Sequence, residues 1–271
     1  STIPFTGTQK RYHLNDQLQS RRILKKGKQH GLYESYFENG QLEEKGNFKN
    51  GEPDGLLERF NENGQLYSRE NYKNGEREGH WEGFHDNGQL EKRVNFKNGK
   101  QDGLWEGYYE NGQLQSRGNY KNGKQDGFFE FFYKNGQLEQ RRNHKNGKPD
   151  GLYECFHANG QLRIIGNYKN GEPDGLFDHF YEHGQLEFRG NSINGKQDGL
   201  WEWFYEHGQL YSRENFKNGQ REGLYETFQY NGQLLTKGKH KNGKKHGLWE
   251  HFDQVGNLTK YETWENGKLV E

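Results

Sequence analysis

The chain has one cysteine, no methionine and only four prolines among its 271 residues. A single cysteine, Cys155, excludes an intrachain disulfide and a cluster of thiolate metal ligands. We interpret Cys155 as a small packed residue rather than a nucleophile. The absent initiator methionine has three explanations, namely its removal before Ser1, loss of an export signal, or trimming of the chain. The compartment therefore stays open, with the cytoplasm favoured over export.

Apolar residues are also scarce, at 28% of the chain against roughly 45–50% in ordinary globular proteins. This content excludes a thick aliphatic core, and no apolar run reaches the length of about 18 residues that a membrane helix needs. Aromatic residues, however, make up 15% of the chain. We therefore expect a thin sheet whose faces are covered by rings. Low hydropathy is also typical of disorder, but the aromatic content and the regular repeat described below argue against it.

There is no excess charge of either sign, since 39 Lys and Arg residues balance 39 Asp and Glu residues. Without a basic excess to neutralise phosphates, we do not expect the chain to bind nucleic acid. Because no apolar run is long enough to span a membrane, integral membrane association is not expected. No polybasic run favours anionic lipid, and peripheral membrane contact remains open.

The most informative feature present is a tetrad that returns every 24 residues without insertion or deletion. It reads Asn-Gly-Gln-Leu in seven copies, His-Gly-Gln-Leu at His183 and His207, and has weakened forms at Asn15 and Val255. The full copies begin at Asn39, Asn63, Asn87, Asn111, Asn135, Asn159 and Asn231. Such a period indicates one unit stacked on itself, which is an array or solenoid. Arrays of this kind present long binding surfaces and seldom form a catalytic pocket.

Each repeat contains two turn signals, as the stretch from Gly103 to Asp126 illustrates. Asn111-Gly112 predicts a two-residue type I′ hairpin turn, and the stretch 122–127, which begins Asn-Gly, predicts a longer turn. The segments 104–110 and 113–121 between them have strand length. The sequence therefore predicts an all-β fold: a single extended antiparallel β-meander or solenoid of 24-residue two-strand hairpins, twisted or superhelical. We divide it into an N-terminal capping segment (1–11), the array (12–260) and a C-terminal capping strand or tail (261–271).

A two-residue loop at Asn111-Gly112 fixes which side chains face each other. Glu106 then faces Arg117, and Trp105 faces Gly118, which we expect to lie beneath the tryptophan ring. In most repeats an acidic residue faces a cation in the same way, at Glu34–Lys45, Glu58–Arg69, Glu82–Arg93, Glu106–Arg117, Glu130–Arg141, Asp178–Arg189, Glu202–Arg213 and Glu226–Lys237. Glu154 and Glu250 instead face Ile165 and Tyr261. A repeated carboxylate column indicates structural cross-strand ion pairs rather than general acid–base machinery.

The half-unit Gly-Asn-Tyr-Lys-Asn-Gly-Lys-x-Asp-Gly, seen at 118–127, resembles the MORN repeat. The other half, Tyr-Tyr-Glu-Asn-Gly-Gln-Leu, is similar to the MORN repeat variant of bacterial YwqK-type antitoxin and immunity proteins. One departure is that leucines such as Leu104 replace the second glycine of the MORN Gly-x-Gly step, which weakens any transfer of eukaryotic MORN lipid binding. The resemblance implies a non-enzymatic array that neutralises a toxin.

Variable positions within an otherwise constant repeat mark a candidate binding surface. The most variable column lies two residues after the Trp105 position, and its larger apolar members gather in the second half. We predict a partner-binding stripe between residues 131 and 213, which includes Phe131, Tyr133, His157, Ile164, His179, Tyr181, Phe188, Trp203 and Tyr205. Packing between adjacent repeats is the alternative explanation of this stripe.

No other chemistry stands out from the repeat. His179, His183 and His207 lie near one another in register, but a turn residue tolerant of positive φ explains the last two, so we predict no metal site. We expect no cofactor and no catalytic residue. Three functions remain open. The first is an array that binds a protein partner, possibly a toxin encoded nearby. The second is a self-associating structural or membrane-peripheral scaffold, and the third is an enzyme or a glycan binder that uses aromatic platforms.

Overall fold

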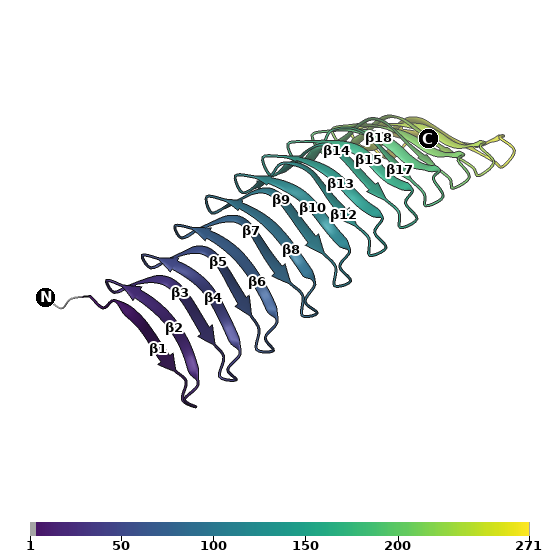
Figure 1. Cartoon of the computed structure of the whole chain (residues 1–271). Helices are drawn as coiled ribbons and strands as arrows, with labels where there is room; N and C mark the ends of the chain where they lie inside the picture. Colours follow the sequence, from purple (N-terminus) through teal and green to yellow (C-terminus); the bar gives the residue numbers. More distant parts are fainter. Residues whose placement is uncertain (1–3, 271) are drawn as a thin grey trace. The chain divides into compact units, whose positions relative to one another are not determined.

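The computed structural model describes residues 4–270, and every regular element within them is a β-strand (Figure 1). These residues include no helix of a length and apolarity that would cross a membrane. The chain divides into two compact units, Ser1–Gly136 (unit 1) and Gln137–Glu271 (unit 2). Each unit is an open antiparallel sheet of hairpin repeats, which confirms the predicted fold class.

Unit 1 contributes the first twelve strands of the described chain. They are β1 (Gly7–Tyr12), β2 (Leu18–Lys25), β3 (Lys28–Tyr36), β4 (Leu42–Lys49), β5 (Glu52–Phe60), β6 (Leu66–Lys73), β7 (Glu76–Phe84), β8 (Leu90–Lys97), β9 (Lys100–Tyr108), β10 (Leu114–Lys121), β11 (Lys124–Gln125) and β12 (Gly127–Phe132). Successive strands lie side by side as hairpins (Figure 1).

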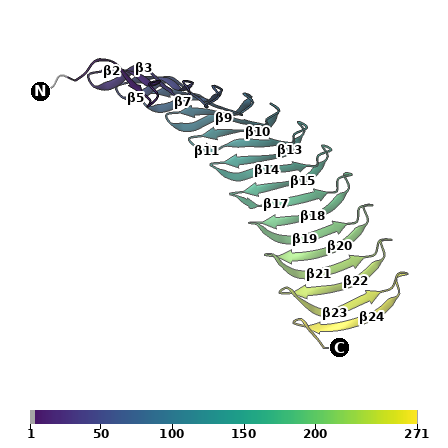
Figure 2. The same cartoon turned by 90° about the horizontal axis from the view of Figure 1, so that it is seen from below.

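Unit 2 holds the remaining strands and repeats the same pattern (Figure 2). They are β13 (Leu138–Lys145), β14 (Lys148–Phe156), β15 (Leu162–Lys169), β16 (Glu172–Pro173), β17 (Gly175–Phe180), β18 (Leu186–Ile193), β19 (Lys196–Phe204), β20 (Leu210–Lys217), β21 (Gln220–Phe228), β22 (Leu234–Lys241), β23 (Lys244–Phe252), β24 (Leu258–Glu265) and β25 (Lys268–Leu269).

The terminal segments that we predicted as caps contain strands where they are described. β1 pairs with β2, and β24 continues past residue 261 before it pairs with β25. Residues 1–3 and 271 lie outside the described part of the chain. Their capping role stays a prediction.

The two turns of each repeat have exchanged the roles that the sequence predicted. Asn122 and Gly123 both have positive φ, 51° and 81°, and the paired residues Lys121 and Lys124 flank them. This is the tight two-residue turn expected of a type I′ geometry. At the other end, Gly112 N donates to Tyr109 O at 2.8 Å and only Gly112 has positive φ, 79°. The prediction of a type I′ turn at Asn111-Gly112 is therefore wrong: a three-residue turn with a glycine bulge forms there.

The predicted register nevertheless holds beyond the turn, because a second irregularity offsets the first. Leu114 pairs with Tyr108, one residue away from the predicted partner Tyr109. The register then shifts between Leu114 and Ser116, and Arg117 returns to Glu106 as predicted. The longer turn and this bulge cancel, so the acidic and cationic columns meet.

The acidic and cationic columns form a ladder rather than isolated pairs. Most cations of the ladder lie between two carboxylates, as Arg117 lies between Glu106 and Glu130. Arg117 forms its salt bridge, at 2.5 Å, with Glu130 on the following strand rather than with Glu106, the predicted partner. Arg93 uses both sides, with Glu82 at 2.9 Å and Glu106 at 3.5 Å. The predicted breaks at Glu154–Ile165 and Glu250–Tyr261 are confirmed, and the pair Glu130–Arg141, which would join the two units, stays a prediction.

The aromatic column that includes Tyr108 gives the arginines of the ladder an apolar platform. The guanidinium carbon of Arg117 lies 5.6 Å from the Phe132 ring centroid, and that of Arg213 lies 5.8 Å from the Phe228 centroid. These distances are typical of cation–π contacts. Where the preceding strand supplies an arginine, as at Arg69, Arg117 and Arg213, the ring of this column carries it.

The core lies on the opposite face, where rings cover bare backbone. Phe129 and Trp249 are 2% exposed, and Leu57 is 3% exposed. Gly118 does lie under a ring, but the ring is Phe129 of the next strand rather than Trp105, which corrects our expectation. Any Cβ at Gly118 would overlap the Phe129 ring. Glycine therefore allows a close approach of ring and backbone that no other residue permits.

The ion ladder predicts a pH-dependent stability. Burial opposes ionisation of Glu82, but the guanidiniums of Arg69 and Arg93 outweigh it and lower the pKa of this carboxyl. Because the folded-state pKa is depressed, Glu82 stabilises the fold above its unfolded-state pKa of roughly 4.3 and loses that contribution as the pH falls through the folded-state value. Urea unfolding between pH 7 and pH 3 should show a smaller loss of stability in Glu82→Gln than in the parent. An equal dependence of the unfolding free energy on pH in both proteins would contradict this prediction. Glu110→Gln, which removes the charge of an exposed carboxylate, is the control.

Candidate functional site

Four of the predicted binding residues form one continuous row across unit 2. Ile164 pairs with His179, and Phe188 pairs with Trp203, on strands β15, β17, β18 and β19. The row is continuous because His179 also pairs with Phe188, which joins the two pairs. The His179 and Phe188 rings stack with centroids 4.5 Å apart. All four side chains are half-buried, so the row presents part of its apolar surface to solvent.

Trp203 and Phe188 belong to a larger ring cluster. Trp201, beside the row on the same face of β19, is 8% exposed and lies 6.0 Å from Trp203 and 6.1 Å from Phe188, centroid to centroid. Phe216 lies 6.4 Å from Trp203. The position of each exposed ring is therefore fixed by packing, which is the arrangement expected of an aromatic anchor in a binding surface.

Three further predicted residues bind the backbone of the next repeat. The Tyr181 hydroxyl donates to Phe204 O at 2.8 Å and the Tyr205 hydroxyl to Phe228 O at 3.0 Å. His157 Nε2 lies 3.0 Å from Phe180 O. These hydrogen bonds hold successive turns together, so the polar ends of the three side chains have a structural role. Only their half-buried rings remain available to contact a partner.

The last two predicted residues, Phe131 and Tyr133, belong to unit 1. Phe131 lies on β12 opposite Ser116, and Tyr133 begins the turn that follows β12. Both are half-buried. The stripe proposed from sequence thus includes a continuous row in unit 2 and two residues of unit 1.

A packing rule decides which members of the variable column are large. Thirteen residues before each member lies the column that holds Gly118. Where that earlier residue is glycine, the variable residue is bulky, at Arg59, Phe131, His179, Trp203 and His251. Where it is Arg22, Glu70, Val94, Arg142 or Glu214, the variable residue is small, at Ser35, Gly83, Gly107, Cys155 and Thr227.

The ring between the two columns explains this rule. With glycine present, as at Gly238, the ring of Trp249 lies on the backbone and leaves room for a bulky His251. With Val94 present, the Trp105 ring shifts to Gly107, where a Cβ would come within 3.3 Å of it. The size of the residue in the variable column therefore depends on where the ring lies. Bulky residues occur in this column only where the ring lies on the glycine of the preceding strand.

This rule predicts a compensating pair of substitutions. Gly238→Val should destabilise unit 2 by roughly 2 kcal/mol, because the new side chain overlaps Trp249. Adding His251→Gly should recover part of this loss, since it reproduces the arrangement of Val94, Trp105 and Gly107. Urea denaturation of the parent, both single variants and the double variant measures the coupling energy. Strictly additive effects would contradict the rule.

The histidines of the turns have a different role from the predicted one. Neither His183 nor His207 has positive φ, so tolerance of that conformation does not explain them. His183 Nε2 lies 2.7 Å from Glu206 O and His207 Nε2 lies 3.0 Å from Tyr230 O. Asn39 donates to Glu62 O at 2.8 Å in the same way. Histidine thus replaces asparagine as a hydrogen-bonding link between repeats.

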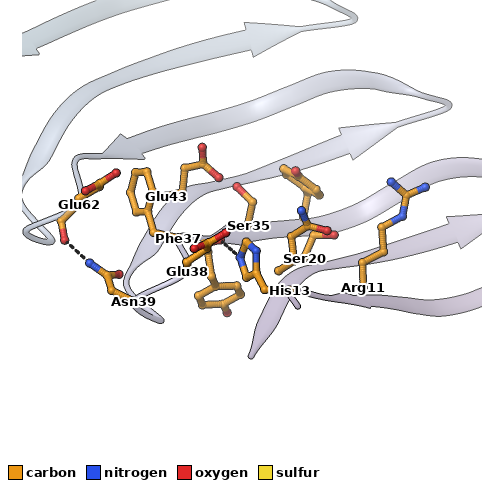
Figure 3. A pocket seen from close by; sticks show the side chains of 12 residues that line it. Arg11, His13, Ser20, Ser35, Phe37, Glu38, Asn39, Glu43 and Glu62 are labelled. Atoms are coloured by element: carbon orange, nitrogen blue, oxygen red, sulfur yellow. Dashed lines mark hydrogen bonds between the residues drawn. The ribbon is translucent and has the colours of Figure 1, made fainter. Parts of the chain in front are cut away.

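Hollows in unit 1 were not predicted from the sequence. One of about 610 Å³ lies beside Ser20, Ser35 and Glu43 (Figure 3), and His13 Nε2 is 2.8 Å from Tyr36 O at its wall. A second, of about 720 Å³, lies three repeats further along, beside Gly107. Both coincide with a small residue in the variable column, which is the signal that could have located them. Residues 4–270 contain no group of three or more His, Cys, Asp or Glu side chains suited to a metal ion.

Comparisons with known proteins identify the repeat. A family profile described as "MORN repeat variant" matches residues 29–50, 53–74, 77–98, 101–122, 125–146, 149–170 and 197–218. No curated protein matches the chain. The solved structure entitled "Crystal Structure of TcdB2-TccC3" aligns with 96% of this chain and 18% of that chain, at 10% identity and a TM-score of 0.21. This chain thus spans less than a fifth of that protein, and the low score supports no conclusion.

Proposed function

The chain belongs to the MORN repeat variant family, and we propose that it is a non-enzymatic array that binds a protein partner. Its specific form would be that of an antitoxin or immunity protein which neutralises a toxin encoded nearby. The observation that carries this proposal is the row of Ile164, His179, Phe188 and Trp203. The toxin-neutralising form rests on the resemblance of the half-unit Tyr-Tyr-Glu-Asn-Gly-Gln-Leu to the repeats of YwqK-type proteins.

The physical case for partner binding is the combination of rigidity and exposure in this row. A fixed, half-exposed tryptophan loses little conformational freedom when a partner covers it, so most of its apolar burial contributes to affinity. Beside it, Trp201 and Phe216 hold the ring in place. Aromatic anchors of this kind dominate the binding energy of protein interfaces.

The test is binding to the product of the neighbouring gene, measured by titration calorimetry. We expect one-to-one binding, and Trp203→Ala should weaken it by at least about 2 kcal/mol, or roughly thirtyfold. Tyr67→Ala removes a ring that is 57% exposed in unit 1 and is the matched control. Equal affinity of the Trp203→Ala variant and the parent, with both folded, would refute the assignment of the row.

A self-associating scaffold is a second candidate, because a row of leucines is exposed on the other face. In unit 2, Leu176, Leu200 and Leu248 are 54%, 44% and 52% exposed. Leucines that recur at multiples of the repeat length suit contact with the identical surface on a second copy of this chain.

Light scattering over a hundredfold concentration range tests this second candidate. If the leucines mediate association, oligomers should grow with concentration, and Leu200→Glu should abolish them because it places a charge in the apolar contact. A parent that stays monomeric at the highest concentration would exclude the scaffold. Lys196→Glu, a change on the same strand outside the leucine row, is the control.

A further inference from the structure

The tyrosine that follows the long strand recurs at an equivalent position in several repeats, so its surroundings can be compared. Tyr109 donates to Phe132 O at 2.7 Å, as Tyr181 does to Phe204 O at 2.8 Å. Because the same hydrogen bond fixes both rings, a residue 25 positions later takes the same place relative to each. For Tyr109 that residue is Lys134, and for Tyr181 it is Glu206.

In unit 1 the chain itself supplies a cation to this ring. Lys134 Nζ lies 5.9 Å from the Tyr109 ring centroid, within the range of a cation–π contact. Tyr109, Gln115 and Lys134 line the hollow of about 720 Å³ beside Gly107. This tyrosine position therefore accommodates an ammonium group.

In unit 2 the positions equivalent to Lys134 and Gln115 hold carboxylates instead, at Glu206 and Glu187. Burial, followed by the charges of Glu187 and Glu206, raises the pKa of Tyr181. Glu187 replaces the neutral Gln115 of unit 1 and also bonds His179 Nδ1 at 2.9 Å. Across residues 4–270, Glu206 forms no salt bridge with a lysine or arginine.

We propose that Tyr181, Glu187 and Glu206 bind a lysine or arginine side chain presented by the protein partner. His183 stacks on one face of the Tyr181 ring, with centroids 5.6 Å apart, so the incoming cation takes the other face and the two carboxylates neutralise it. This inference rests on the proposed function and specifies the partner: a basic residue beside an apolar one. Glu187 joins the two parts of the surface, since it contacts His179 of the apolar row.

A sugar could also stack on tyrosine rings, but the acidic surroundings favour a cation. Neutral hydroxyl groups gain little from two carboxylates, whereas a guanidinium stacks on an aromatic face and pairs with a carboxylate at the same time. The distinction is therefore one of charge.

The probes are the peptide acetyl-Leu-Gly-Arg-Gly-Leu-amide and the same peptide with citrulline, a neutral isostere, in place of arginine. Binding is followed by NMR chemical shifts of the full chain at low and physiological salt. We expect the arginine peptide to bind at least about fivefold more tightly than the citrulline peptide, with a difference that shrinks as salt screens the charges. Equal binding of the two peptides, or stronger binding of a neutral oligosaccharide, would overturn the proposal.

Three variants locate the site. Glu206→Lys copies the unit 1 arrangement and should abolish arginine-peptide binding, because the chain's own cation then occupies the ring. Glu182→Lys makes the same charge change one repeat earlier, where the equivalent side chain is His157, and should change affinity less than twofold. Lys134→Glu combined with Gln115→Glu should create a second site at Tyr109 and so raise the stoichiometry.

The outcomes separate this inference from the proposed function. If the neighbouring gene product binds through Trp203 and is unaffected by Glu206→Lys, the cation site is wrong while partner binding stands. If Trp203→Ala has no effect on a partner that Glu206→Lys releases, the apolar row is wrong and the cation site stands. Thermal unfolding of each variant confirms that any loss of binding is not a loss of fold.

Discussion

The fold depends on one contact, in which a ring from one strand lies on the bare backbone of the strand before it. At Gly238 the Trp249 ring takes up the space of a side chain, and the ring itself is 2% exposed. This contact buries a large ring without a second layer. It helps to explain how a chain with 28% apolar residues forms a sheet, since in the repeats that have this glycine the ring covers the adjacent strand and needs no aliphatic core.

The surface of unit 2 follows from the same contact. Because Gly190 lets the Trp201 ring lie flat, the next position in the variable column is free for a bulky Trp203. Packing and binding are therefore not opposed explanations of the variable column. Packing decides where a large side chain fits, and in unit 2 the large side chains that fit form the half-buried row.

Polar links between repeats complement the ring contact. Asn39, His183 and Tyr181 differ in chemistry, yet each forms a hydrogen bond to a backbone carbonyl of the next turn. Because this bond is the constant requirement, the residue beside it can change sign between repeats. The exchange of Lys134 for Glu206 is such a change, and it is the basis of the cation site.

The sequence by itself determined the repeat, the antiparallel hairpins and the pairing of Glu106 with Arg117, because an unbroken period and alternating strands leave little other choice. Only the tertiary structure decided the turn types, since a longer turn at Asn111-Gly112 and a bulge before Ser116 cancel and leave the register unchanged. It also decided that Phe129 rather than Trp105 covers Gly118, and which carboxylate Arg117 bonds. Every residue of a central strand has two neighbours across the sheet, and side-chain geometry in three dimensions selects between them.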